Sequence, residues 1–150
     1  MIRWLDLLYP RRCPMCGEIL PLGRTVCSCT ARRVRRVGAD ACTHCGNVEE
    51  NCTCDLEVGR ALRHFTAPFY YTDLVCARLR SLKFQGERRL AKPLGAQMAL
   101  RFAECFAEAD VDVVTFIPMD RASQKERGYN QTALLAKQVG RSLMIDVRPL

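Results

Sequence analysis

The sequence of 150 residues contains no long apolar run, and this absence argues against two classes of protein. The first ten residues carry charges at Arg3 and Asp6, and they are too short for a secretory signal core or a membrane span. Without a secretory signal, the cysteines are not expected to form disulfides, because the cytosol keeps thiols reduced. The sequence therefore predicts a cytoplasmic protein without a transmembrane segment.

Histidine is also scarce, and the sequence has neither low-complexity tracts nor internal repeats beyond its cysteine pairs. His64 is one of two histidines, and no carboxylate or thiol neighbours it in the sequence. A single histidine of this kind more often packs against other side chains than binds metal or catalyses. No candidate general base is evident, so the sequence assigns no catalytic residue.

Cysteine, in contrast, is abundant, and eight of the ten cysteines fall within the first 54 residues as close pairs. Two thiolates separated by one or two residues can bind one tetrahedral metal ion, and two such pairs complete a four-sulfur site. Gly17 and Gly46 follow two of the pairs and permit the positive backbone angle that turns amides toward sulfur. The pattern predicts two zinc ions bound by Cys13, Cys16, Cys27, Cys29, Cys42, Cys45, Cys52 and Cys54.

The spacing leaves open which pairs share a metal ion. Sequential pairing would give two successive ribbons, and an interleaved cross-brace is the alternative. The short segment between Cys45 and Cys52 is a mild argument for interleaving, but sequential pairing is favoured. The second and fourth pairs have a single intervening residue, which holds their two sulfur atoms closer together on the metal ion.

Basic residues outnumber acidic ones by 23 to 16, and the formal net charge is +7. Such an excess favours anionic partners. The densest basic run directly follows the second cysteine pair and consists of Arg32, Arg33, Arg35 and Arg36. Two interpretations are open, since the run is typical both of a solvated helical face and of contacts to nucleic-acid phosphates.

The composition changes along the chain and predicts two units. Residues 1–60 hold most of the cysteines and little periodic apolar pattern, so metal is expected to stabilise them more than a hydrophobic core. Residues 61–150 have an ordinary globular composition. The first helix predicted in this second unit begins at Asp73, with Asp73 as its cap, and ends near Gln85-Gly86, with Val75, Leu79 and Leu82 on its apolar face. Two further helices are predicted from Lys92 to Glu108 and, capped by Asn130, to about Leu143. The apolar stripe expected on the middle helix is Leu94, Met98, Phe102 and Phe106.

Strand patterns alternate with these helices. Residues 61–71 are rich in aromatic residues and predict one or two short edge strands. The β-branched run 111–117 predicts a strand buried on both faces of a parallel sheet, and 144–150 predicts the next strand. This alternation indicates an α/β sheet with crossover connections.

The segment 118–131 follows the predicted strand 111–117, and ligands of α/β sheets bind beyond the carboxyl ends of strands. It is expected to be a loop that offers cations, a glycine for close backbone approach and amides at a helix start, which together suit a phosphate or pyrophosphate. A basic surface loop without a ligand is the alternative. The candidate residues are Arg121, Lys125, Arg127, Gly128, Asn130 and Gln131.

Several motifs, in order and in register over essentially the whole chain, resemble the ComF family of double-zinc-ribbon, phosphoribosyltransferase-like proteins. The most specific one is Arg-Gly-Tyr-Asn-Gln at 127–131, after a strand that ends in Ile117-Pro118. The paired cysteines and Leu-Lys-Phe-Gln-Gly at 82–86 precede it, followed by Leu90-Ala91 and Pro-Leu-Gly at 93–95.

The resemblance implies an N-terminal zinc-ribbon module over 1–60 and, over 61–150, the N-terminal part of an α/β domain with the type I phosphoribosyltransferase fold. It also implies that 118–131 lies beside a pocket for phosphoribosyl pyrophosphate, which magnesium accompanies. Members of the family are linked to DNA uptake in natural competence. Single-stranded DNA and proteins of the competence machinery are therefore expected partners.

The sequence departs from the family pattern in two respects. The cysteine pairs with one spacer residue replace pairs with two. The acidic phosphoribosyl pyrophosphate loop is not found, because the only adjacent acidic pair is Glu49-Glu50 in the cysteine-rich part. We therefore expect an incomplete, truncated transferase domain that is inactive as a transferase in this form. The alternative function is a non-enzymatic adaptor that binds single-stranded DNA or competence proteins.

Overall fold

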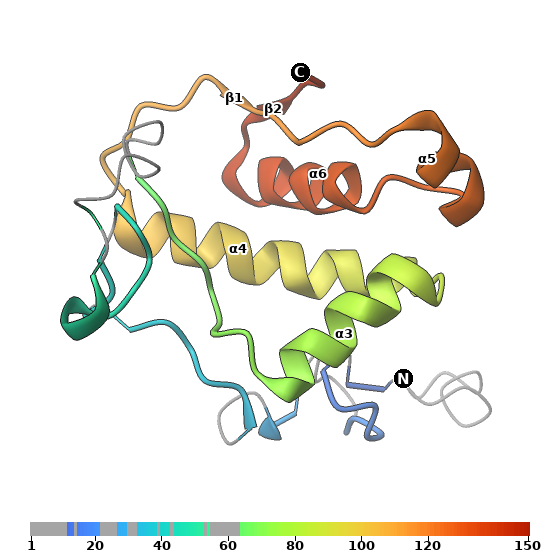
Figure 1. The fold of residues 1–150 in the computed structure, drawn as a ribbon, viewed down its shortest axis with the longest axis horizontal. Coiled ribbons are helices and arrows are strands. Elements are labelled where there is room, and N and C mark those ends of the chain that lie inside the picture. Colours follow the sequence, from blue (N-terminus) through green and yellow to red (C-terminus); the bar gives the residue numbers. More distant parts are fainter. Residues whose placement is uncertain are drawn as a thin grey trace.

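The computed structural model describes residues 12–13, 15–21, 27–29, 33–38, 40–42, 44–52, 54 and 64–150. Four α-helices dominate the described part: α3 (Asp73–Phe84), α4 (Ala91–Cys105), α5 (Arg121–Arg127) and α6 (Gln131–Leu143). Two short 3₁₀ helices, η1 (Glu49–Asn51) and η3 (Arg88–Leu90), and two strands, β1 (Val113–Val114) and β2 (Asp146–Val147), complete it. The helix α6 lies between the strands and α4 (Figure 1).

The two strands are parallel, as the predicted alternation of helices and strands requires. Val113 lies opposite Asp146 and Val114 opposite Val147, while the chain passes through α5 and α6 between the strands. The Arg148 N–H extends the ladder by donating to the Val114 carbonyl oxygen over 3.0 Å. A helical connection is what parallel strands need, because a tight turn cannot join them.

Burial of the first strand on both faces was expected, and this prediction is wrong for the described chain. Val113 and Val114 are only half-buried. The sheet described here has two strands, and α6 contacts both of them, so helical cover is evident from one side only. Both strands are also shorter than the runs 111–117 and 144–150.

The helix α3 begins at the predicted residue, Asp73, but the N-cap position belongs to Thr72. The helix buries Val75 and Leu82, while Leu79 stays half-buried. It ends at Phe84, one residue before the predicted end. The predicted apolar face of α3 is therefore confirmed in its position, although Asp73 is not the cap.

The stripe expected on α4 is confirmed only in part, because Leu94 is buried and Phe102 and Phe106 are half-buried but Met98 is exposed. Met98 is 39% exposed, whereas the small residues Gly95 and Ala99 are buried with Leu94. A Cβ atom added at Gly95 would lie 2.7 Å from the Gln138 Cβ atom of α6. The small residues therefore allow α4 and α6 to approach closely, and this packing turns Met98 outward. The helix also ends at Cys105, three residues before the predicted end.

A single hydrophobic cluster joins the cysteine-rich part to the helices. It contains Cys13 and Cys29 from the first two cysteine pairs together with Leu82, Leu94 and other buried residues of α3 and α4. Residues on both sides of the predicted boundary near residue 60 therefore share one core. The division into units 1–60 and 61–150 stays a prediction.

The predicted edge strands within 61–71 reduce, among the described residues 64–71, to one antiparallel bridge between Phe69 and Arg36. Around it, Tyr70 N–H donates to the Arg35 carbonyl oxygen over 3.0 Å, and Val37 N–H donates to the Pro68 carbonyl oxygen over 3.2 Å. The pairing fixes residues 35–37 in an extended conformation. Among the described residues, no helix has the length and apolar character that a membrane crossing requires.

Candidate metal centres

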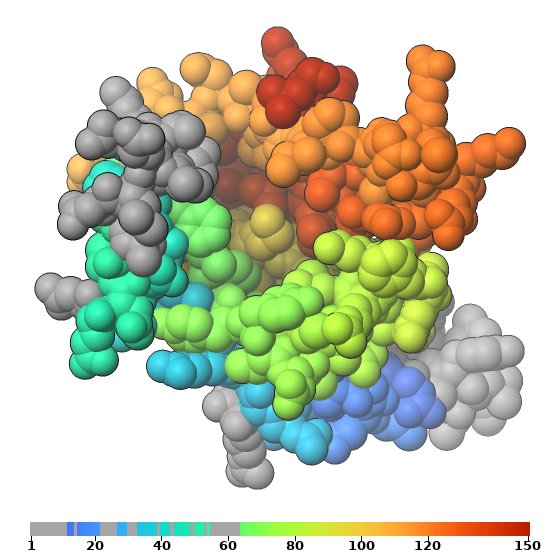
Figure 2. Space-filling view, viewed as in Figure 1, coloured from blue at the N-terminus to red at the C-terminus, as the bar shows by residue number. Residues whose placement is uncertain are grey.

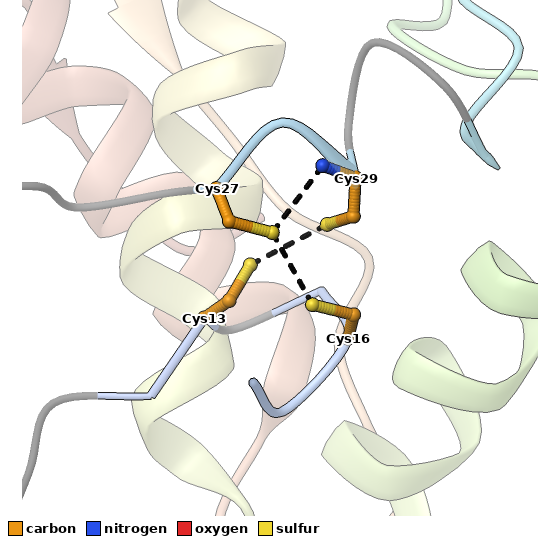
Figure 3. A group of neighbouring side chains, drawn as sticks. All are labelled: Cys13, Cys16, Cys27 and Cys29. Carbon is orange, nitrogen blue, oxygen red and sulfur yellow. Dashed lines mark hydrogen bonds between the residues drawn. The ribbon is translucent and has the colours of Figure 1, made fainter. Parts of the chain in front are cut away.

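The structure brings the first two cysteine pairs together into one four-sulfur cluster, which we call the first site. Its sulfur atoms all lie within 4.8 Å of one another. The Sγ atoms of Cys13 and Cys29 are 3.5 Å apart and those of Cys16 and Cys27 are 3.3 Å apart, and the side chains converge from two turns (Figure 3). A zinc–sulfur distance of 2.3 Å corresponds to tetrahedral sulfur separations of about 3.8 Å. The four residues fit a zinc ion.

The third and fourth pairs form the second site, with the same convergence. All four sulfur atoms again lie within 4.8 Å of one another. The Sγ atom of Cys54 is 3.2 Å from that of Cys42, and the Sγ atom of Cys52 is 3.6 Å from that of Cys45. Pairing is therefore sequential, and the cross-brace is excluded. The single spacer residues do not prevent either site from forming.

The backbone of the two sites follows one design. In the first site, Gly17 has a φ of 81° and its N–H donates to the Cys13 carbonyl oxygen over 2.8 Å. In the second, Gly46 has a φ of 77° and donates to the Cys42 carbonyl oxygen over 2.8 Å. A residue with a Cβ atom would be strained at both positions. The glycines that the sequence singled out therefore close the turns that aim the sulfur atoms inward.

Backbone amides make the first site favour an anionic sulfur. Burial raises the pKa of the Cys13 thiol, but hydrogen bonds from the backbone of Cys27, Cys16 and Met15 outweigh burial and lower this pKa to about 6. Burial and the adjacent thiols raise the pKa of Cys29. The Cys13 thiol thus loses its proton readily, whereas the Cys29 thiol resists ionisation. A divalent cation relieves this conflict, because it stabilises all four thiolates together.

The second site repeats this opposition. A hydrogen bond from the Cys45 backbone is the largest factor that lowers the pKa of Cys42, and the hydrogen bond with the Cys42 side chain is the largest that raises the pKa of Cys54. All ten cysteines lie among the described residues, and none of them forms a disulfide. Both sites therefore have the donor set and geometry of structural zinc centres.

The predicted nucleic-acid run lies between the two sites. Arg33, Arg35 and Arg36 are exposed, and Arg32 lies outside the described residues. The Arg35 guanidinium stacks 4.5 Å from the ring centroid of Tyr70, and Arg36 forms a 3.4 Å ion pair with Glu104 of α4. Residues 35 and 36 are extended, so the run is not a continuous helical face.

The predicted phosphate loop contains the helix α5, which the sequence analysis missed. The Asp120 carboxylate accepts a hydrogen bond from the Ser123 N–H over 2.8 Å, and this bond lowers the pKa of Asp120. Gly128 ends the helix with a φ of 71° and donates its N–H to the Gln124 carbonyl oxygen over 2.8 Å. The available signal was an acidic residue suited to cap a helix, Asp120, followed at position 128 by a glycine suited to end one.

The candidate residues of this segment separate into two groups. Arg121 and Lys125 are exposed on α5. The Asn130 side chain instead caps α6 by accepting from the Thr132 and Ala133 N–H groups, and Gln131 is buried. The backbone N–H of Gly128 and the side-chain oxygen of Asn130 are thus engaged in hydrogen bonds within the chain.

Arg127 lies between the two groups and connects α5 to the end of α3. Its guanidinium stacks 4.9 Å from the Phe84 ring centroid and donates to the Gln131 Oε1 atom over 3.4 Å. The surfaces of α3 and α5 adjoin on this face of the molecule (Figure 2). Arg88, which no sequence motif singled out, stacks on the Tyr129 ring at 4.6 Å and donates to the Gly128 carbonyl oxygen over 3.0 Å.

Comparison with known proteins gives two similarities. Residues 4–62 match the family model of the double zinc ribbon domain. The chain is 25% identical over 125 residues to the competence protein ComFC of Bacillus subtilis (strain 168), which corresponds to 77% of this chain and 52% of that protein. The chain thus spans about half the length of this curated relative. No solved structure matches it significantly.

Proposed function

We propose, from the premise that this chain belongs to the ComF family, that it joins a zinc-bound ribbon module to the first part of a phosphoribosyltransferase-like α/β domain and acts in DNA uptake during competence. The double zinc ribbon and the similarity to ComFC support the family. The competence role is carried over from the name of that relative. The cytoplasm is the proposed location, because reduced thiolates are required for both zinc sites.

One observation supports the transferase-like fold more than any other. The parallel pair β1–β2 is connected through α5 and α6, and the exposed cations Arg121 and Lys125 follow the carboxyl end of β1. Ligands of α/β sheets bind beyond this end of the strands. The proposed ligand is phosphoribosyl pyrophosphate, and magnesium would enter with it to neutralise phosphate charge.

The family reaction is displacement of pyrophosphate at the anomeric carbon of the ribose. We propose that this chain supplies contacts to the pyrophosphate and does not catalyse the transfer by itself, because the acidic loop is not found in its sequence. Arg121 and Lys125 would bind the pyrophosphate, and Arg127 would contribute from its position beside Phe84. Positive groups that hold the leaving pyrophosphate stabilise the charge that develops on it. Gly128 and Asn130 would shape the loop, since the Gly128 N–H donates to the Gln124 carbonyl oxygen and the Asn130 side-chain oxygen caps α6. Gln131 would orient Arg127, whose guanidinium donates to the Gln131 Oε1 atom.

Calorimetric titration of the protein with phosphoribosyl pyrophosphate and magnesium tests this proposal. We expect binding that weakens about tenfold or more in the double variant R121A/K125A, because two charge-assisted contacts are lost. The matched control K137A/R141A removes two exposed cations from α6 and should bind like the parent. If the parent protein does not bind, phosphoribosyl pyrophosphate is ruled out as its ligand. If R121A/K125A binds as well as the parent, this loop is ruled out as the binding site.

A second function, a non-enzymatic adaptor for single-stranded DNA or competence proteins, has a different observation in its favour. Arg33, Arg35 and Arg36 are exposed, and the stacking of Arg35 on Tyr70 places an aromatic ring under a cation. Guanidinium and aromatic groups together are typical of surfaces that bind single strands. Arg32 belongs to the same run of the sequence and is included in the proposed interface.

A gel-shift titration with single-stranded DNA at several salt concentrations tests the adaptor function. We expect binding that weakens as salt rises, because phosphate contacts release counterions. The variant R32A/R33A/R35A/R36A should lose it, while the control K137A/R141A should retain it. If the parent protein does not shift single-stranded DNA at low salt, the DNA-binding form of the adaptor function is ruled out.

A further inference from the structure

The two zinc sites differ in their exposure to solvent. In the first site, Cys13 is 2% and Cys29 is 6% exposed. In the second site none of the four cysteines is buried, and the Cys52 residue is exposed to solvent. Cys16 and Cys27 of the first site are half-buried, so the two sites differ in that the first has two buried ligands and the second has none.

The surroundings of the sites explain this difference. Cys13 and Cys29 belong to the hydrophobic cluster, which packs Met15 and Leu20 against side chains of α3 and α4. No cysteine of the second site belongs to that cluster among the described residues. A reagent can reach the second site directly, whereas it can reach the buried sulfur atoms of the first site only when the core opens.

Among the described residues, ring contacts link the second site to Phe106, the residue that follows α4. The His64 ring lies 5.6 Å from the His44 ring and 5.2 Å from the Phe106 ring, measured between centroids. His64 thus has the packing role expected from the sequence. Phe65 covers Gly46, where an added Cβ atom would lie 2.5 Å from the Phe65 ring. None of the residues in these contacts belongs to the hydrophobic cluster among the described residues.

We propose that the second site is an oxidation-sensitive centre, at which a peroxide converts Cys52 and a neighbouring cysteine into a disulfide and zinc is lost, while the first site keeps its zinc. Cys52 is the most accessible ligand, and the sulfur atoms of Cys54 and Cys45 lie 3.2 Å and 3.6 Å from it. A resolving thiolate is thus already beside the first thiolate to be attacked.

The chemistry balances with hydrogen peroxide as the oxidant. The Cys52 thiolate attacks one peroxide oxygen, the O–O bond breaks, and the leaving hydroxide takes up a proton to form water, which leaves a sulfenic acid. The thiolate of Cys54 or Cys45 then attacks this sulfur, the S–O bond breaks, and the second hydroxide is protonated. Two thiolates have lost two electrons, and the site retains two thiolates, too few to hold zinc.

The test uses the zinc-loaded chain with C76S/C105S substitutions, which remove both cysteines outside the two sites. Hydrogen peroxide is added, and zinc release is followed with a chromogenic chelator. We expect release in two phases, the first about tenfold faster than the second, because oxidation follows thiolate exposure. Peptide mapping after the first phase should find the disulfide at Cys52 and still detect reduced Cys13 and Cys29.

A matched pair of variants assigns the phases. C52S and C29S each remove one ligand of a one-spacer pair, from the second and the first site respectively. C52S should retain one zinc that is released slowly, and its far-UV circular dichroism should keep the helical signal. C29S should retain one zinc that is released rapidly.

Three results would each overturn the proposal: release of both zinc ions in one phase, oxidation of Cys13 or Cys29 before Cys52, or rapid loss of the zinc that C52S retains. If C29S does not fold, the two phases of the parent chain and the behaviour of C52S still decide the outcome. Loss of the helical signal in the fast phase would also count against it, since the second site lies outside the core.

Discussion

The guanidinium of Arg101 donates a hydrogen bond to the carbonyl oxygen of Gly38 over 2.8 Å and thereby ties the middle of α4 to the segment between the two zinc sites. Arg101 is only 8% exposed. It also donates to the Thr66 Oγ1 atom over 3.1 Å and pairs with Glu104 over 3.5 Å. This buried cation is thus partnered on three sides and links segments far apart in the sequence.

Replacing Arg101 by alanine should lower the free energy of unfolding by about 2 kcal/mol, because two half-buried acceptors lose a charged donor. Urea denaturation of the zinc-loaded chain measures this change. E104Q is the control, since Glu104 is partly exposed and such pairs contribute about 1 kcal/mol or less. Equal stability of R101A and the parent would contradict the role assigned to Arg101.

Loss of the first site should destabilise the helices more than loss of the second. We expect C13S to lower the free energy of unfolding by about 3 kcal/mol or more, because Cys13 lies in the core and zinc binding contributes directly to folding. C52S should leave α3, α4 and α6 folded. Thermal melting followed by circular dichroism compares them, and metal analysis should find two zinc ions in the parent and one in C52S. Equal melting temperatures of C13S and C52S would show that the two sites contribute equally to stability despite their different burial.

The substitution G95A tests the packing of α4 on α6. Helix propensity alone predicts that alanine stabilises a helix by about 1 kcal/mol relative to glycine. In the structure the new Cβ atom would lie 2.7 Å from the Gln138 Cβ atom, so we expect a loss of about 1–3 kcal/mol instead. Urea denaturation shows whether G95A raises or lowers the free energy of unfolding. A stabilised G95A variant would mean that α4 and α6 do not approach this closely.

Removing the hydroxyl of Tyr129 should cost about 1 kcal/mol of unfolding free energy, because this buried group donates to the Leu82 carbonyl oxygen at the end of α3. Y129F keeps the ring on which Arg88 stacks, so the effect reports on the hydrogen bond alone. Y71F is the control, since the Tyr71 side chain is 71% exposed. Both variants can be measured by urea denaturation. An equal effect of Y71F would contradict the prediction.

The zinc ligands could be predicted from the sequence because their geometry is local. A pair of cysteines one or two residues apart, followed by a glycine such as Gly17 or Gly46, already fixes two sulfur atoms on one turn. The helix starts at Asp73 and beyond Asn130 were predictable for the same reason, since capping and periodicity depend on near neighbours. The exposure of Met98 on α4 was not, because the approach of α6 to Gly95 turns this side chain outward.

The sequence by itself determined the zinc ligands, the expectation of two zinc ions and the three longer helices, all of which follow from short-range spacing. Only the tertiary structure decided that pairing is sequential, that Cys13 lies in the core while Cys52 lies at the surface, and that Arg101 joins α4 to Gly38. These properties depend on segments that are distant in the chain, and burial is a property of the packed molecule alone.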